Sequence, residues 1–258
     1  MERPFAGGLH IARVIQYLKD REQEEGGFSL IPQLYPDIED TYYAIRTFLL
    51  LNHRVNRDQT DRYLKSMDWR QVHSPRTIYM LTYLHCTLRL EIPSPLIQLL
   101  NQDGPPLQTL DGQYFSDEIQ KLLNRPLKPL LPLLPFHLQP HENVQALRKK
   151  VTLWINHGVR FARDPILLWV RSCQNGDGGF GFYPGTTSYM ENTYCALEIL
   201  SKLNSSPTQL DLCRKYILGC QTKSGGFGRA PASFPFIEST FHAVMGLFLL
   251  EKMGGEEV

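Results

Sequence analysis

The stretch that decides the fold is GGFSLIPQLYPDIEDTYYA, which runs from Gly26 to Ala44. Its Gly-Gly-Phe opening returns twice further along the chain, as Gly178–Phe180 and as Gly225–Phe227. In each copy a proline stands four residues after the Phe and a threonine stands thirteen residues after it. The threonines are Thr41, Thr193 and Thr240. A fixed spacing of this kind is typical of repeat proteins, so the stretch predicts a fold built from repeated units.

Each unit is predicted to be a helix, a Gly-Gly-Phe turn, a short loop with a proline, and a second helix. Glycine permits the positive φ that ends a helix, and proline restricts the loop. Phe180 and Phe227 are 47 residues apart, whereas Phe28 and Phe180 are 152 apart, or about three units. We therefore expect two degenerate units in between, one with a helix over 77–90 and one with a worn turn at 111–115.

About five to six helical hairpins would then fill residues 1–258 as a single all-α domain. Periodicity alone leaves two architectures open, because helix pairs of this kind can stack into an open solenoid or close into a ring.

The composition excludes several classes of function. The chain has a net charge of +1 and no run of five like charges, which argues against nucleic acid as a partner. Its N-terminus lacks the apolar core of a signal peptide, and its apolar runs are too short to span a bilayer. Five cysteines without a CxxC pair fit a reducing compartment. We therefore expect a soluble, cytoplasmic protein.

The strong copies resemble a known repeat. Two of them read Cys-Gln-x-x-x-Gly-Gly-Phe-Gly, followed by Pro and by Thr-aromatic-x-Ala before a Leu-rich helix. This pattern is similar to the repeat of protein prenyltransferase β subunits and of squalene and terpene cyclases. The resemblance implies an α/α toroid, in which an inner and an outer ring of helices surround an apolar cavity. It also implies an isoprenoid ligand, and a partner subunit like the α chain of the protein prenyltransferases is possible.

The acidic residues near each threonine have a structural interpretation. Asp40, Asn192 and Ser239 directly precede the threonines and are residue types that cap helix N-termini. A glutamate stands one place earlier in every copy, where the positive end of the helix dipole favours a carboxylate. These glutamates are Glu39, Glu191 and Glu238. Their recurrence favours an architectural role over a unique catalyst.

The functional alternative depends on the first copy, where Asp37 joins Glu39 and Asp40. The resulting Asp-x-Glu-Asp-Thr resembles the Asp-x-Asp-Asp-Thr motif of class II terpene cyclases, whose middle acid protonates an alkene or epoxide. The resemblance implies Glu39 as the proton donor, with Asp37 and Asp40 tuning it. Crowded carboxylates beside an apolar cavity cannot all ionise, so one of them would have a raised pKa.

The resemblance to prenyltransferases can be tested at the metal site. That family holds zinc with an Asp-x-Cys and a His. The corresponding positions here are Tyr189 and Glu191, or Glu191 and Thr193, with Ser239 in place of the His. We therefore expect no zinc, whereas Mg²⁺ is possible if the ligand is a diphosphate.

Aromatic residues recur at the starts of the second helices, as Tyr42, Tyr43, Tyr194 and Phe241. Helix packing is their default role, but their faces could also line the cavity and bind substrate or stabilise a carbocation. His242, next to Phe241, is either a core residue or a substrate contact. Glu191 and Glu238 would lie at the same rim as Glu39.

A proline- and leucine-rich insert lies near 125–140, with a proline at every third residue. It would pack on the helices as a strap, or act as a flap or a surface for peripheral membrane contact.

The sequence thus leaves three hypotheses. The first is proton-initiated, class II-like cyclisation of an isoprenoid. The second is a prenyltransferase-like protein without the usual zinc. The third is a non-catalytic toroid that binds an isoprenoid or a partner protein.

Overall fold

A computed structural model of the protein describes residues 8–101, 109–130, 137–139 and 141–254. Helices dominate these residues, with one short 3-10 helix and two paired strands of two residues each. The helices of the first half are α1 (Ile11–Lys19), α2 (Ile38–Leu50), α3 (Arg57–Lys65), η1 (Trp69–Gln71), α4 (Pro75–Thr87), α5 (Ser94–Asn101) and α6 (Leu110–Leu122). The second half contains α7 (Val144–Asn156), α8 (Arg163–Ser172), α9 (Met190–Lys202), α10 (Leu210–Gly219), β1 (Phe227–Gly228), β2 (Pro235–Phe236) and α11 (Ile237–Gly254).

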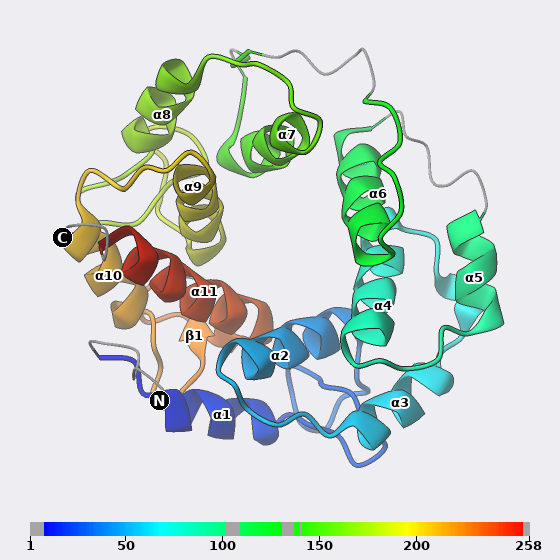
Figure 1. Cartoon of the computed structure of the whole chain (residues 1–258). Helices are drawn as coiled ribbons and strands as arrows, with labels where there is room; N and C mark the ends of the chain where they lie inside the picture. The colour runs from blue at the N-terminus through cyan, green and yellow to red at the C-terminus, as the bar shows by residue number, and fades with distance from the viewer. Residues whose placement is uncertain (1–7, 102–108, 131–136, 140, 255–258) are drawn as a thin grey trace.

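The helices form two concentric rings (Figure 1). In the inner ring α2, α4, α6, α7, α9 and α11 follow one another, and α11 packs against α2 to close the circle. The outer ring contains α1, α3, α5, α8 and α10. The all-α, α/α toroid predicted from the repeats is therefore confirmed, and the ring rather than the open solenoid is formed.

The recurring threonine explains the constant spacing of the repeats. In each strong copy the threonine hydroxyl accepts a hydrogen bond from the backbone N–H of the Phe thirteen residues earlier, at 2.9 to 3.0 Å. The same hydroxyl donates to the carbonyl oxygen four residues before it. Because one hydroxyl makes both short bonds, the distance along the chain from the turn to the inner helix is fixed. The pairs are Phe28 with Thr41, Phe180 with Thr193, and Phe227 with Thr240.

The first glycine of each turn brings the turn against an outer helix. Gly26, Gly178 and Gly225 have φ values of +99°, +89° and +97°. A Cβ on any of them would lie 2.0 to 2.2 Å from a backbone oxygen of the facing helix, so a side chain cannot be accommodated. The three oxygens belong to Gln59 on α3, Leu212 on α10 and Arg13 on α1. The turn of the third copy therefore packs against the first helix of the chain.

The number and form of the degenerate units differ from the prediction. Three inner helices, α4, α6 and α7, lie between the strong copies, where two degenerate units were expected. In the described residues α6 and α7 follow one another as two inner helices without an outer helix between them, which accounts for the additional inner helix. The expected helix over 77–90 corresponds to α4. The worn turn predicted at 111–115 is wrong, because these residues belong to α6, whose first turn is capped by the Thr109 hydroxyl.

The proline- and leucine-rich insert joins α6 to α7, and its residues 131–136 and 140 lie outside the described residues. In the part that is described, Leu130 and Leu138 pack against the hydrophobic core. This contact agrees with a strap on the helices for these two residues.

The predicted helix caps are also wrong. Asp37, not Asp40, is the N-cap of α2, and its side chain accepts a hydrogen bond from the Asp40 backbone N–H at 2.8 Å. Asn192 and Ser239 likewise lie inside the first turns of α9 and α11. The helices begin earlier than expected because each threonine hydroxyl must reach the carbonyl one turn before it, which requires helical backbone in between.

Candidate functional site

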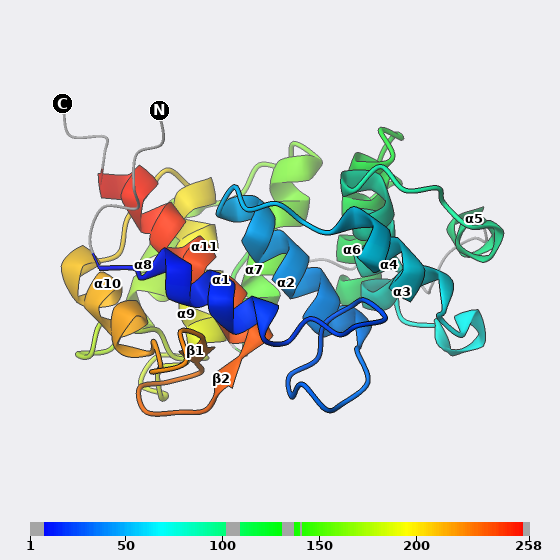
Figure 2. The same cartoon turned by 90° about the horizontal axis from the view of Figure 1, so that it is seen from below.

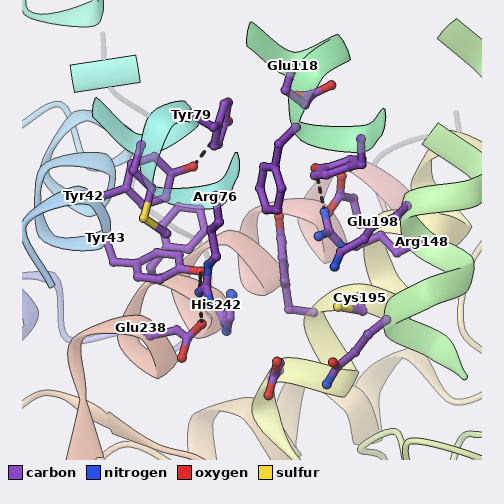
Figure 3. A pocket seen from close by; sticks show the side chains of 18 of the residues that line it. Tyr42, Tyr43, Arg76, Tyr79, Glu118, Arg148, Cys195, Glu198, Glu238 and His242 are labelled. Carbon is purple, nitrogen blue, oxygen red and sulfur yellow. Dashed lines mark hydrogen bonds and ion pairs between the residues drawn. The ribbon is translucent and has the colours of Figure 1, made fainter. Parts of the chain in front are cut away.

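A cavity of about 240 Å³ lies inside the inner ring (Figure 3). All six inner helices contribute to it, mostly from positions spaced three, four and seven residues apart on one helical face. From the first half of the ring the lining residues are Tyr42, Tyr43, Arg46, Arg76, Tyr79, Met80, Asp111, Tyr114, Phe115 and Glu118. From the second half they are Gln145, Arg148, Lys149, Glu191, Tyr194, Cys195, Glu198, Glu238, Phe241 and His242.

Aromatic side chains form a belt around this cavity. Tyr42, Tyr79, Tyr114, Tyr194 and Phe241 occupy the same register position in five of the inner helices. The rings of Tyr42 and Tyr79 are 5.9 Å apart, and those of Tyr194 and Phe241 are 6.0 Å apart. The sequence-predicted aromatic residues therefore do gather at the cavity, together with Tyr43, whose ring is 5.3 Å from that of Phe241.

Arg148 on α7 takes the sixth position of this belt. Its guanidinium lies 5.1 Å from the ring of Tyr114 and 6.0 Å from that of Tyr194. It donates hydrogen bonds to the Tyr114 hydroxyl and to Glu198, both at 3.0 Å (Figure 3). The cation thus completes the belt through two cation–π contacts and is balanced by one buried carboxylate.

The resemblance implied an apolar cavity, and this expectation is wrong. The cavity lining is charged. Arg46, Arg76, Arg148 and Lys149 line it together with several carboxylates. Buried charges persist only when they are paired and hydrogen-bonded, and most of these are. Arg148, for example, pairs with Glu198 at 3.0 Å, and both side chains are 15% exposed.

Arg76 connects two of the recurring glutamates. Its guanidinium forms an ion pair with Glu39, a second with Glu238 at 3.3 Å, and a hydrogen bond to the Tyr43 hydroxyl at 3.1 Å. Glu191, the third recurring glutamate, pairs instead with Arg229 at 3.3 Å. Burial raises the pKa of Glu39, and the neighbouring Arg76 opposes that shift.

Sequence reasoning missed Arg76, although a signal was present. When the helices are aligned on their first turns, Arg76 in the degenerate unit occupies the position that the recurring glutamate has in the strong copies. A single charge of opposite sign at such a position indicates an ion pair across the ring.

Of the three acidic residues of the first copy, Asp37 and Asp40 lie close together, whereas Glu39 pairs with Arg76. Asp37 caps α2, and Glu39 contacts Arg76. Burial raises the pKa of the Tyr17 hydroxyl on α1 and of the Tyr63 hydroxyl on α3, and the nearby Asp40 carboxylate raises both further. Burial, and then the Asp37 carboxylate, raise the pKa of Asp40 to about 7. Consecutive residues project about 100° apart on a helix, so Glu39 and Asp40 face different sides of α2.

His242 is held between aromatic rings. It stacks on Tyr194 with a centroid distance of 4.6 Å and an interplanar angle of 14°, and it lies 5.5 Å from the ring of Tyr43. Burial, together with Arg148, Arg46 and Arg76, lowers the pKa of His242 to about 3. The imidazole is therefore neutral near pH 7, and three guanidinium groups are near enough to disfavour its protonation.

Arg46, which sequence reasoning also missed, lies one turn further along α2 than Tyr42 and Tyr43. It donates a hydrogen bond to the Tyr42 hydroxyl at 2.7 Å, and its guanidinium lies 4.3 Å from the ring centroid of Phe241. Within the described residues it has no carboxylate partner, in contrast to Arg76, Arg148 and Lys149. An aligned search for cations on the cavity face of the predicted helices could have found it.

The described residues contain no group of three His, Cys, Asp or Glu side chains that could hold a metal ion. Of the positions that correspond to the zinc ligands of prenyltransferases, Tyr189 is the N-cap of α9 and Ser239 is buried in the first turn of α11.

Comparisons with known proteins agree with this geometry. A family model described as the prenyltransferase alpha-alpha toroid domain matches residues 9–78 and 146–258. The unmatched part contains α5, α6 and the proline- and leucine-rich insert, where the repeats are degenerate. No curated protein matches the chain. Among the described residues, no helix is long and apolar enough to cross a membrane. Because the family model covers more than half of the chain, the protein belongs to the prenyltransferase alpha-alpha toroid family.

Proposed function

We propose that the cavity binds a short isoprenoid diphosphate, with Arg46 as the principal contact of the diphosphate group. The observation that carries this proposal is the cavity-lining guanidinium of Arg46, which has no carboxylate partner among the described residues. An anionic ligand would balance this charge, because a buried cation is costly unless it is paired. Guanidinium groups also match the geometry of phosphate oxygens through paired N–H donors.

The pairing of the lining carboxylates leaves the positive charge of Arg46 for an anion. Each lining carboxylate already has a cation within 3.3 Å, so none is left to pair with Arg46. These pairs are Asp111 with Lys149, Glu118 with Lys121, Glu191 with Arg229, Glu198 with Arg148, and Glu238 with Arg76.

The aromatic belt supports an isoprenoid as the rest of the ligand. Aromatic faces bind apolar chains and can stabilise an allylic cation if the carbon–oxygen bond of the diphosphate ionises. The volume of about 240 Å³ lies below the usual range of small-molecule pockets, roughly 300–1,000 Å³, which favours a short chain. Dimethylallyl and geranyl diphosphate are therefore the ligands to test, with and without Mg²⁺.

Isothermal titration calorimetry with these two diphosphates tests the proposal. Replacing Arg46 with Gln removes a charge-assisted contact, so the Kd should rise by about 10- to 150-fold, the equivalent of about 1.5–3 kcal/mol. Arg70→Gln removes the same group from a fully exposed position on η1 and should leave the Kd unchanged. Absence of binding, or an Arg46→Gln variant that binds as tightly as the wild type, would refute the proposal.

Catalysis can be followed in the same samples. Release of pyrophosphate would support ionisation and prenyl transfer without the usual zinc, whereas retained ligand without turnover would support a binding protein.

Proton-initiated cyclisation by Glu39 is the second candidate. The raised pKa of Glu39 favours it, and the ion pair with Arg76 counts against it. A cyclised product that keeps its diphosphate, lost in Glu39→Gln but not in Glu191→Gln, would support this chemistry over ionisation.

Peripheral membrane contact is a further proposal, now based on the loops that follow the Gly-Gly-Phe turns. The loops before α2 and between β1 and β2 both lie at the lower edge of Figure 2. They carry Leu34, Tyr35 and Phe234, whose side chains are 54%, 95% and 58% exposed. Exposed aromatic and aliphatic residues of this kind are common at lipid interfaces.

Co-sedimentation with phosphatidylcholine vesicles tests this contact. The double variant Leu34→Ser, Phe234→Ser should no longer co-sediment, whereas Leu168→Ser, at an exposed site on α8, should bind like the wild type. Equal binding by the wild type and both variants would refute the contact.

A further inference from the structure

Two arginines face each other across the central cavity. Arg46 belongs to α2 and Arg148 to α7, which lie on opposite sides of the inner ring (Figure 1), and both side chains line the cavity. Burial and Glu198 raise the pKa of Tyr194, whereas Arg148 and Arg46 both oppose this shift, so both guanidinium groups lie near the Tyr194 hydroxyl. A diphosphate carries more than one negative charge near pH 7, so a second cation opposite Arg46 would complement it.

The present partner of Arg148 decides whether its guanidinium can turn to a ligand. Arg148 donates to Oε2 of Glu198 at 3.0 Å, and this side chain is only 15% exposed (Figure 3). A buried carboxylate that loses its cation is costly, but Glu198 has a second one, because the ammonium group of Lys202 contacts its Oε1 at 2.9 Å. Burial raises the pKa of Glu198, but Arg148 and Lys202 outweigh it and lower the pKa to about 2. Glu198 would therefore stay paired after Arg148 has left.

Arg76 differs from Arg148 in this respect. Among the described residues it is the only cation paired with Glu39 and the only one paired with Glu238. Moving Arg76 to a ligand would leave two neighbouring carboxylates without a counter-ion, which is unfavourable. Arg76 is therefore held in its present pairs.

Lys149 is the competing candidate for a second contact. It follows Arg148 on α7 and pairs with Asp111, whose side chain is 59% exposed and can be solvated without a partner. Arg148 is favoured because its guanidinium lies 6.0 Å from the centroid of the Tyr194 ring, in the belt opposite Arg46. A guanidinium can also donate two parallel N–H bonds to phosphate oxygens, which an ammonium group cannot.

We propose that Arg148 is a second contact of the diphosphate and that Lys202 is the positioning residue that makes this contact possible. When the ligand binds, Arg148 leaves Oε2 of Glu198 and donates to a phosphate oxygen, while Lys202 stays on Oε1. Lys202 does not line the cavity, so it acts only through Glu198. This inference rests on the diphosphate ligand proposed above.

Calorimetric titration with dimethylallyl diphosphate tests the inference. Arg148→Gln should raise the Kd about tenfold or more. Lys202→Met leaves Arg148 as the only cation on Glu198, so the Kd should rise about five- to tenfold, and Lys202→Arg should recover most of the affinity. The matched control is Lys121→Met, which removes the same ammonium group from the lining residue Glu118 and should raise the Kd less than about twofold. Lys202 is 30% exposed, so its variants should fold even if Arg148→Gln does not.

Glu198→Gln separates this role of Lys202 from a structural one. The variant removes the competitor for Arg148, so the Kd should fall below that of the wild type. Adding Lys202→Met should then raise the Kd no more than Lys121→Met does. An effect of Lys202→Met that is equal in both backgrounds, or no larger than that of Lys121→Met, would overturn the role of Lys202.

Two other outcomes would overturn the contact with Arg148. They are a wild-type Kd in Arg148→Gln, and a larger loss of affinity in Lys149→Met than in Arg148→Gln. If Arg46→Gln still weakens binding in either case, only the second contact is refuted. Absence of binding to the wild type would refute the proposed function and this inference together.

Discussion

The threonine that connects each turn to its inner helix allows a sharp test, because α2 contains its own control. Thr41 and Thr47 lie six residues apart on this helix, and both are completely buried. Each hydroxyl donates to the carbonyl oxygen four residues earlier, at 2.7 and 2.8 Å. Thr41 alone of the two also accepts a hydrogen bond, from the backbone N–H of Phe28 at 2.9 Å. Valine is nearly the same shape as threonine, so replacing each in turn isolates this one interaction.

The expected difference follows from the fate of the Phe28 N–H. Thr47→Val loses only a bond within the helix and should cost no more than about 1 kcal/mol of unfolding free energy. Thr41→Val also leaves a buried N–H without an acceptor, which adds about 1–3 kcal/mol. For a chain of this size each kcal/mol lowers the Tm by about 2–4 °C, so Thr41→Val should melt several degrees below Thr47→Val.

Urea unfolding would measure the free energies, and hydrogen exchange would report the Phe28 amide directly. Exchange at that amide should accelerate in Thr41→Val alone. If both variants lose the same stability to within about 0.5 kcal/mol, the interpretation of the thirteen-residue spacing is wrong.

Three further predictions concern other parts of the ring. Gly225→Ala should destabilise the protein by several kcal/mol more than Gly185→Ala in urea unfolding, because both glycines have positive φ but only Gly225 faces a backbone oxygen, at 2.2 Å from the added Cβ. Burial raises the pKa of Asp40 from 3.8 to about 7. The protonated carboxyl therefore stabilises the fold fully below pH 3.8, and this stabilisation is lost as the pH rises through about 7. Asp40→Asn should therefore raise the Tm at about pH 8 and leave it unchanged at about pH 3. Arg76→Met leaves two carboxylates close together and should lower the Tm, and adding Glu39→Gln should restore part of the loss; additive effects in this double-mutant cycle would contradict the ion pair.

The parts of the fold that could be predicted are those with strong local signals. The Gly-Gly-Phe turns and the threonines are connected by hydrogen bonds over thirteen residues, so their pattern is visible in the chain itself. The start of α2 was misplaced by three residues because Asp40 and Asp37 are equally good caps, and only the reach of the Thr41 hydroxyl decides between them. The degenerate region was predicted less well, since α6 and α7 pack without an outer helix between them in the described residues.

The charged lining of the cavity depends on contacts between distant segments. Arg76 and Glu238 are 162 residues apart in sequence and meet only because α11 closes the ring against α2, next to α4. The aromatic positions were predicted because the same residue type recurs at them in several units. The positive charges of Arg46, Arg76 and Arg148 do not recur in the strong copies, so the repeat did not reveal them. Their convergence around His242 required the three-dimensional structure.

The contact between the third turn and α1 has a consequence for the connectivity of the chain. Gly225 packs against the backbone of Arg13, just as Gly26 packs against Gln59 and Gly178 against Leu212. The contact between the last Gly-Gly-Phe turn and the first helix is therefore of the same kind as the other two contacts between a turn and an outer helix. The packing around the ring therefore does not depend on which helix comes first in the chain. A circular permutant that links residue 254 to residue 8 through a flexible peptide, with new ends in the exposed loop near Asn204, should keep the same toroid.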